Sequence, residues 1–390
     1  MISAFIARTR TARTRIGRAL RIGILPLMAL ALAACQPAPA PIQPLPMAQA
    51  SIPADAGPRR VFYSGHSLLQ QPLQDHVELI AKANGVDLGW DRQDRFGSLL
   101  RQRTQGDDPA AETWTGWTSG ENRVGKGLDV RAALAGEIPG QAPFDTLIVT
   151  ERHDILWTLL HERTALHLRR MHDARVAGKP DGTTWLYESW QSLAVEDPAR
   201  WIQYESDVAG AWQCVSAEVN RSLIAEGRAD RVHNLPAARA LAHLVQKATS
   251  APGVPGLVAP AGTPVARLLF QDAVHPTPAT AYYLAQVTWA FVSGAPAAQP
   301  AVPEGLDPAL AQSLRVVAAE AHAKLRDQAL SSASAAECET ALQRLCPGVW
   351  SYMADRWQAD GDSWPRARWR QFQLQRQCTE GIRDGRYKLL

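Results

Sequence analysis

The chain has 390 residues, a formal net charge of +3 and five cysteines. Six arginines lie between Arg8 and Arg21 with no acidic residue among them, and removing these six charges from +3 leaves −3 for the chain that follows residue 34. Nucleic-acid binding depends on clustered Lys and Arg that neutralise phosphates. The later residues contain no such cluster, so we expect no nucleic-acid partner.

Residues 1–34 have the pattern of a secretory signal. Arginines are followed by an apolar run, Ile22–Ala34, that is shorter than the ~20 residues of a membrane-spanning helix. The run ends in Leu32-Ala33-Ala34-Cys35, which resembles the lipobox of bacterial lipoproteins. We therefore expect export and lipidation of Cys35, the alternative being an uncleaved N-terminal anchor helix. Gln36 after the cysteine favours the outer membrane, with the protein facing the periplasm.

Residues 35–58 are rich in Pro and Ala, which predicts an extended tether. From residue 59 to 294, short apolar strands alternate with longer helical stretches, a pattern that favours a parallel α/β sheet with helices on both faces. The expected strands are Arg60–Tyr63, one that begins at Val86, Phe144–Thr150 and Thr183–Trp190. The expected helices are Pro72–Asn84 with Gly85 as its C-terminal cap, Leu156–Ala177, Trp201–Glu226, Ala237–Ala248 and one that ends near Val292.

A second Pro/Ala-rich stretch, residues 295–306, predicts a linker between two regions. Asp307-Pro308 is typical of a helix start, with the aspartate as N-cap and the proline in the first turn. Residues 307–390 contain no further strand signal, so we expect a C-terminal helical region. Its function is not indicated by the sequence.

Four further cysteines are Cys214, Cys338, Cys346 and Cys378. In an exported chain disulfides are permitted, and four cysteines allow three pairings. Because three of the four lie in the last 53 residues, we expect at least one bridge within the C-terminal region. None has the spacing of a zinc ribbon or a thioredoxin-type redox site.

Two segments carry residues suited to nucleophilic catalysis. Ser64-Gly65-His66-Ser67 follows the first predicted strand, at the sheet edge where open α/β folds bind ligands. The alternative for Ser67 is an ordinary N-cap or turn residue. In Asp272-Ala273-Val274-His275, a carboxylate three residues before a histidine can orient the imidazole while its other ring nitrogen accepts a serine proton.

These segments resemble conserved blocks of the SGNH (GDSL-like) hydrolases. Gly65-His66-Ser67-Leu68 is similar to the first block, Asp272–His275 to the last, and Asp145–Asp154 to the strand that ends Gly-x-Asn-Asp in the family. The resemblance covers residues 59–294 and implies a three-layer, flavodoxin-like α/β/α fold. It also implies that Ser67 is the nucleophile, His275 the general base and Asp272 its orienting acid.

The third block departs from the family pattern. Glu151 and His153 stand where the family has Gly and Asn, and that asparagine normally donates a hydrogen bond to the oxyanion. An imidazole N–H donates as well, so His153 is a candidate oxyanion donor, the alternative being a loop histidine with no role in the site. Gly116 or Gly120, in a Gly-rich loop, is the candidate for the glycine of the second block.

Other residue types carry weaker signals. The chain has thirteen tryptophans, among them Trp114, Trp117, Trp185 and Trp190, which suit either sugar stacking or the core. The histidines at positions 153, 161, 167 and 172 do not repeat the i, i+4 spacing that places two metal ligands on one helix face. We expect no metal and no other cofactor.

Taken together, these features predict a cell-envelope serine esterase. Its expected substrate is a carboxyl ester, an acetyl ester on a glycan being the favoured case. One alternative is a polysaccharide O-acyltransferase that uses the same residues. Another is a catalytically inactive lipoprotein that binds glycan or assists assembly. The oligomeric state is not indicated.

Overall fold

The computed structural model describes residues 59–105, 116–329 and 333–389. The predicted signal peptide, Cys35, the tether and Trp114 lie outside the described residues, so the expectations for them stay predictions. No helix among the residues described is long and apolar enough to cross a membrane.

A seven-stranded mixed sheet forms the centre of the described chain, in the order β4-β3-β2-β1-β5-β6-β7. Five strands are parallel, and β3 and β4 form an antiparallel hairpin at one edge. The strands are β1 (Arg59–Gly65), β2 (Leu88–Asp94), β3 (Gly120–Asn122), β4 (Gly127–Leu128), β5 (Thr146–Thr150), β6 (Thr183–Tyr187) and β7 (Val232–Leu235).

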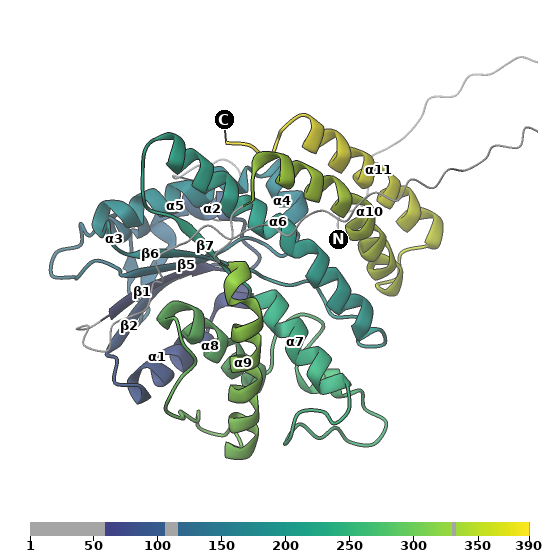
Figure 1. Cartoon of the computed structure of the whole chain (residues 1–390), viewed down its shortest axis with the longest axis horizontal. Coiled ribbons are helices and arrows are strands. Elements are labelled where there is room, and N and C mark those ends of the chain that lie inside the picture. The colour runs from purple at the N-terminus through teal and green to yellow at the C-terminus, as the bar shows by residue number, and fades with distance from the viewer. Residues whose placement is uncertain (1–58, 106–115, 330–332, 390) are drawn as a thin grey trace, which may run out of the picture. The chain divides into compact units, whose positions relative to one another are not determined.

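Helices cover both faces of this sheet (Figure 1). One face carries α1 (Leu73–Ala83), α7 (Ala237–Thr249), α8 (Pro278–Ser293) and α9 (Pro308–Ala329). The other carries α2 (Leu100–Thr104), α3 (Val130–Leu134), α4 (Ile155–His161), α5 (Thr164–Gly178) and α6 (Pro198–Ala225). The α/β class predicted from the alternation of strands and helices is confirmed.

The central strands are buried on both faces, which explains their continuous apolar sequences. Val61, Phe62 and Tyr63 of β1 are each at most 2% exposed, and every residue of β5 is buried. Parallel strands covered by helices on both sides lack the polar alternation of a half-exposed strand. This core holds the carboxyl ends of β1 and β5 next to each other.

Several local expectations differ from the structure. The helix expected over Leu156–Ala177 is divided into α4 and α5, because Arg163 between them adopts a left-handed conformation with φ of 52°. Strand β7 has only four residues and was not predicted. The Gly-rich segment expected to be a loop instead includes the short strand β3.

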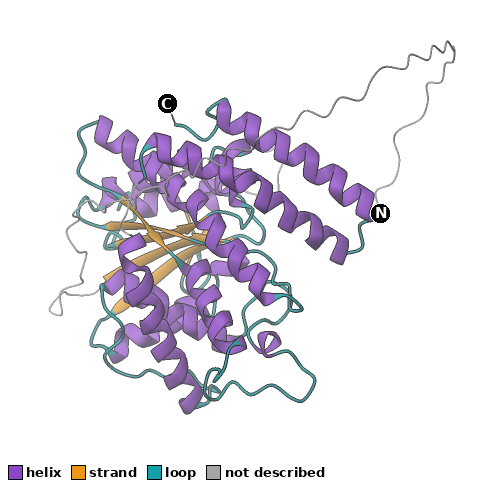
Figure 2. Cartoon of the chain, turned by 45° about the vertical axis from the view of Figure 1, so that its right-hand side comes forward, coloured by secondary structure: helices purple, strands orange, loops and turns teal. Residues whose placement is uncertain are grey.

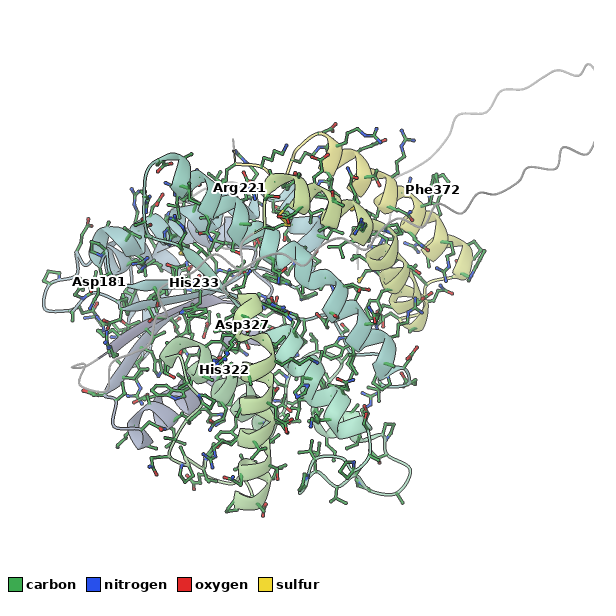
Figure 3. The ribbon with its side chains drawn as sticks, in the orientation of Figure 1. Asp181, Arg221, His233, His322, Asp327 and Phe372 are labelled. Atoms are coloured by element: carbon green, nitrogen blue, oxygen red, sulfur yellow. A yellow bond between two sulfur atoms is a disulfide. The ribbon has the colours of Figure 1, made fainter. Side chains whose placement is uncertain are left out.

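The predicted linker at 295–306 does not separate two bodies. The described residues all fall within one compact unit, and α9 packs on α8, where the ring of His322, marked in Figure 3, lies 4.9 Å from that of Phe291. The predicted start of α9 is confirmed, since the Asp307 carboxylate accepts a hydrogen bond from the Leu310 N–H at 2.8 Å. The apolar face of α9 is buried by the α/β unit, so this helix belongs to it.

The last two helices, α10 (Ala335–Ala359) and α11 (Trp364–Arg383), form a hairpin seen side by side in Figure 2. A disulfide between Cys214 and Cys338 ties α10 to α6, and a second between Cys346 and Cys378 ties α10 to α11. The expected bridge within the C-terminal region is therefore confirmed.

Candidate functional site

Ser67 lies immediately beyond the carboxyl end of the central strand β1. The chain turns sharply there, because a Cβ on Gly65 would come within 2.8 Å of the Leu69 Cβ. The turn leads into a short 3-10 helix that begins at Ser67 itself, and the serine is half-buried. The glycine thus permits the close turn that carries the hydroxyl out of the sheet edge.

The structure brings Ser67, His275 and Asp272 together. Ser67 Oγ lies 2.9 Å from His275 Nε2, and His275 Nδ1 lies 2.6 Å from an Asp272 carboxylate oxygen. Both contacts are within hydrogen-bond distance, so an Nδ1–H donor to the carboxylate leaves Nε2 free to accept the serine proton. The contact spans 208 positions of sequence. The proximity predicted for these three residues is present, and their catalytic roles stay predictions.

The other oxygen of Asp272 shapes the loop that carries the histidine. It accepts the backbone N–H groups of Val274 at 2.7 Å and His275 at 2.8 Å. Slight burial raises the pKa of Asp272, but these donors and the His275 ring outweigh burial and hold that pKa at about 2. The carboxylate is therefore charged at any pH near neutrality.

The loop after β6 forms hydrogen bonds with the backbone of the loop that carries His275. The Trp190 indole N–H donates to the Val274 carbonyl at 2.8 Å, and the Leu193 N–H donates to the Ala273 carbonyl at 2.7 Å. Trp190 is fully buried. These bonds hold the loop in place, although the exposed fraction of its two triad side chains is 27% for His275 and 56% for Asp272.

His66, the residue before the serine, is buried and neutral. Its Nδ1 accepts the Leu68 N–H at 3.4 Å, and its Nε2 lies 3.1 Å from the Glu151 carbonyl, which requires the proton on Nε2. Burial, followed by the charge of Arg103, lowers the pKa of His66 to about 3. His66 thereby links the turn after β1 to the segment after β5.

His153 lies beside this link. Its ring centroid is 6.4 Å from that of His66 in an edge-to-face arrangement. Burial is the main cause that lowers its pKa, and the nearby His275 lowers it further, so His153 is neutral near pH 7. A neutral imidazole at this position, in contact with the residue that precedes the serine, can donate a hydrogen bond without adding a charge.

Glu151, the other departure from the family pattern, is fully buried and serves as an anchor. Its carboxylate accepts hydrogen bonds from the backbone N–H groups of Leu100 and Arg152 and from the Thr164 hydroxyl, at 2.8–2.9 Å. Burial raises its pKa, and the charge of Arg103 opposes that effect. Its side chain thus links α2, α5 and the segment after β5, and it makes no contact with Ser67.

Gly116 and Gly120, the candidates for the second-block glycine, lie next to strands β2 and β4. The Gly116 carbonyl accepts a hydrogen bond from the Gln93 side chain at 2.8 Å, and a Cβ at Gly116 would overlap the Gln105 carbonyl. Gly120 belongs to β3, where it packs closely against Leu128. The absence of a side chain at these positions allows close packing at the edge of the sheet, and no contact joins either glycine to the triad.

A glycine that we did not single out from the sequence follows a residue that contacts the triad. The Phe96 ring stacks on the His275 ring with centroids 6.2 Å apart, and Gly97 is the next residue. Gly97 has φ of 65°, and its N–H has no acceptor among the residues that the structure describes. The signal that indicates it is its place in the turn directly after β2, at the same sheet edge as Ser67.

The remaining histidines of the sequence cluster have separate partners. His167 contacts the Thr104 hydroxyl, His172 contacts Thr184 and Asp230, and His161 stacks on Trp157. Within the described ranges, no three metal-ligating side chains are grouped. These histidines are part of the packing between helices and sheet.

Comparison with known proteins adds little. No family model matches the chain, and no curated protein matches it. Among solved structures, the chain is similar to a DUF4886 family protein from Bacteroides uniformis, at 13% identity and a TM-score of 0.46, over 69% of this chain and 96% of that one. At this level the likeness supports no inference about activity.

Proposed function

We propose that the chain is a serine esterase of the SGNH type. The observation that carries the proposal is the continuous set of contacts from Asp272 through His275 to Ser67, at 2.6 and 2.9 Å. A hydroxyl, an imidazole and a carboxylate in that order are the parts of an activated serine nucleophile. An ordinary turn serine has no need of an imidazole whose second nitrogen is held by a carboxylate.

The proposed reaction has two stages. Ser67 Oγ attacks the ester carbonyl while His275 Nε2 takes its proton, and the imidazolium is stabilised by Asp272. Collapse of the tetrahedral intermediate breaks the ester C–O bond, and the departing alcohol receives the proton from His275. Water, deprotonated by the same nitrogen, then releases the carboxylic acid and regenerates Ser67.

In this proposal three donors hold the oxyanion. They are the backbone N–H groups of Ser67 and Gly97 and a ring N–H of His153. Neither backbone N–H is bonded to another residue in the described part of the chain. Donors that point at developing charge before it forms need no rearrangement in the transition state. In this proposal Gly97 replaces Gly116 and Gly120 as the second-block donor.

The strand order supports the same proposal. Taken alone, the parallel strands follow the order β2-β1-β5-β6-β7, which is the order of flavodoxin-like sheets. In such sheets the chain reverses direction across the sheet at its first strand, and ligands bind at the carboxyl ends on either side of that point. Ser67 follows β1 and His153 follows β5, the two strands that flank it.

Hydrolysis is favoured over acyl transfer by the exposure of the triad. Transfer to a second alcohol requires that water be kept from the acyl enzyme, whereas Asp272 is 56% exposed and His275 27%. The expected export signal and lipidation of Cys35 place the enzyme, in this proposal, on the outer membrane facing the periplasm. Its proposed substrates are then carboxyl esters of envelope or imported glycans.

The direct test is hydrolysis of p-nitrophenyl acetate by the purified protein and its Ser67→Ala variant. Loss of the nucleophile should lower kcat by about 10⁴-fold or more. Ser313→Ala is the matched control, because this hydroxyl lies on the exposed side of α9 and bonds only within its own helix. Equal rates for the wild type and Ser67→Ala would reject the esterase proposal.

A further inference from the structure

A cavity of about 430 Å³ lies between α4 and the C-terminal hairpin formed by α10 and α11. Its volume falls within the ~300–1000 Å³ range of ligand sites. Its walls come from the segment after β5, the loop after β6 and both helices of the hairpin, and the triad residues take no part in them. The cavity therefore exists only because the C-terminal helices fold back onto the α/β unit.

Three tryptophans form a row along this cavity. The rings of Trp157 and Trp350 meet edge to face at 6.5 Å, and those of Trp350 and Trp357 are stacked at the same distance with 29° between their planes. Trp157 and Trp357 are only partly buried: His161 covers one face of the Trp157 ring, the Arg370 guanidinium covers one face of the Trp357 ring, and part of each side chain remains exposed. Flat aromatic faces of this kind attract the slightly positive C–H groups of a pyranose ring, because the π face is negative.

The rest of the lining combines polar side chains with apolar ones, the latter including Leu156, Val349, Met353 and Leu374. Gln191, Gln373 and Gln377 contribute amides, and Arg370, whose guanidinium lies 4.1 Å over the Trp357 ring, contributes a cation. Asp154 contributes a carboxylate, which is paired with the Arg152 guanidinium at 2.7 Å. Amides and charged groups beside aromatic faces match the alternating hydroxyls and C–H faces of a sugar. A fatty acyl chain would offer no hydrogen-bond partner to these amides and charged groups.

The cavity adjoins the triad through two adjacent residues. Asp154 lines it, and the preceding residue, His153, lies against His66 next to the serine. Gln191 lines it from the loop that supports the histidine. The Tyr352 hydroxyl of α10 donates to the Ser192 carbonyl of that loop at 2.7 Å. The cavity and the triad are thus linked through neighbouring residues of the segment after β5 and of the loop after β6.

We propose that this tryptophan-lined cavity is a saccharide subsite that binds the glycan portion of the ester while the acyl group lies at Ser67. The inference rests on the proposed esterase function and assigns its substrate class, an O-acylated oligosaccharide. It also gives a function to the C-terminal hairpin, which supplies most of the subsite's aromatic surface.

Binding is tested without turnover in the full-chain Ser67→Ala protein, titrated calorimetrically with xylotetraose, cellotetraose and chitotetraose. At least one tetrasaccharide should bind, and adding Trp357→Ala should weaken that binding about tenfold, the loss of one aromatic stacking contact. Trp369→Ala is the matched control, because Trp369 lies on the same helix, is 62% exposed and is not part of the cavity. It should leave the dissociation constant unchanged.

Turnover provides the second readout. In the otherwise wild-type enzyme, Trp357→Ala should raise KM for an acetylated xylotetraose about tenfold more than KM for p-nitrophenyl acetate, which has no sugar. Trp357→Phe should recover part of the difference, and circular dichroism checks that each variant is folded. Equal KM changes for the two esters would overturn the subsite.

Two further outcomes would overturn the inference. One is that none of the three tetrasaccharides binds at millimolar concentration. The other is that Trp357→Ala affects p-nitrophenyl octanoate and spares the acetylated sugar, which would make the cavity an acyl-chain site. Failure of the esterase proposal is distinguishable, because Ser67→Ala would then match the wild type on p-nitrophenyl acetate whatever the binding results.

Discussion

His153 is the residue whose chemistry matters most for the rate of the proposed enzyme. It stands where the SGNH hydrolases that the sequence resembles have an asparagine, and its neutral ring lies beside His66 and near His275. Replacing it with Ala should remove one oxyanion donor and lower kcat by about 10²–10³-fold with little change in KM. His153→Asn introduces a side-chain amide that can donate the same hydrogen bond, so this variant should retain most of the activity. Steady-state kinetics on p-nitrophenyl acetate measures both.

An Asn variant as slow as the Ala variant would exclude oxyanion donation through this position. Unchanged kcat in both would make His153 a packing residue, the alternative that the sequence leaves open. His161→Ala is a suitable control, because this histidine stacks on Trp157 within α4 and makes no contact with the triad. It should not alter the rate on a small ester.

At the scale of elements, the α10–α11 hairpin depends on its disulfide. Cys346 and Cys378 are 32 positions apart and both are buried. Closing a loop of that length reduces the entropy of the unfolded chain, which corresponds to about 3–4 kcal/mol of stability. The double variant Cys346→Ser/Cys378→Ser should therefore unfold at lower denaturant concentration, and its hairpin should lose protection in hydrogen exchange first.

Hydrogen exchange followed by mass spectrometry separates the elements. Increased exchange in α10 and α11, with β1 and β5 unchanged, is the expected pattern, because the central strands are covered on both faces by other helices. Uniform loss of protection across the chain would show that the hairpin and the sheet unfold together, contrary to this prediction.

At the scale of the whole molecule, buried histidines make stability depend on pH. Burial is the main cause that lowers the pKa to about 3 in His66 and His167, and to about 4 in His172 and His233. The unfolded chain binds these protons below about pH 6.5, whereas the folded chain does not until about pH 3–4. The stability that these four histidines contribute is therefore fully present above pH 6.5 and is lost as the pH falls toward 4.

As the pH falls below 6.5, each of these histidines should lower the free energy of unfolding by about 1.4 kcal/mol for every pH unit, until its pKa in the folded protein is reached. Urea unfolding at pH 7.5 and pH 5 measures the total. In His167→Gln, whose amide can still contact the Thr104 hydroxyl, the loss between the two pH values should be smaller by about 2 kcal/mol. A loss as large as that of the wild type would contradict the assignment of His167 as buried and neutral.

Local sequence patterns were enough to predict the fold class, several helix ends and the candidate catalytic residues. Alternating apolar strands and helices predicted the α/β class, Gly85 and Asp307 predicted the end of one helix and the start of another, and Ser67 and His275 were identified by the residues around them. These features depend on backbone conformation and burial within a few neighbouring residues. Such signals can be read from the chain without knowing its path in space.

Contacts between distant segments were decided only by the tertiary structure. The turn after β2 brought Phe96, the residue before Gly97, against the His275 ring. The pairing of the cysteines, the docking of α9 on α8 and the tryptophan cavity likewise join segments far apart in sequence. Each loop follows a strand with a similar local pattern, so only the positions of the strands in the sheet determine which loops meet.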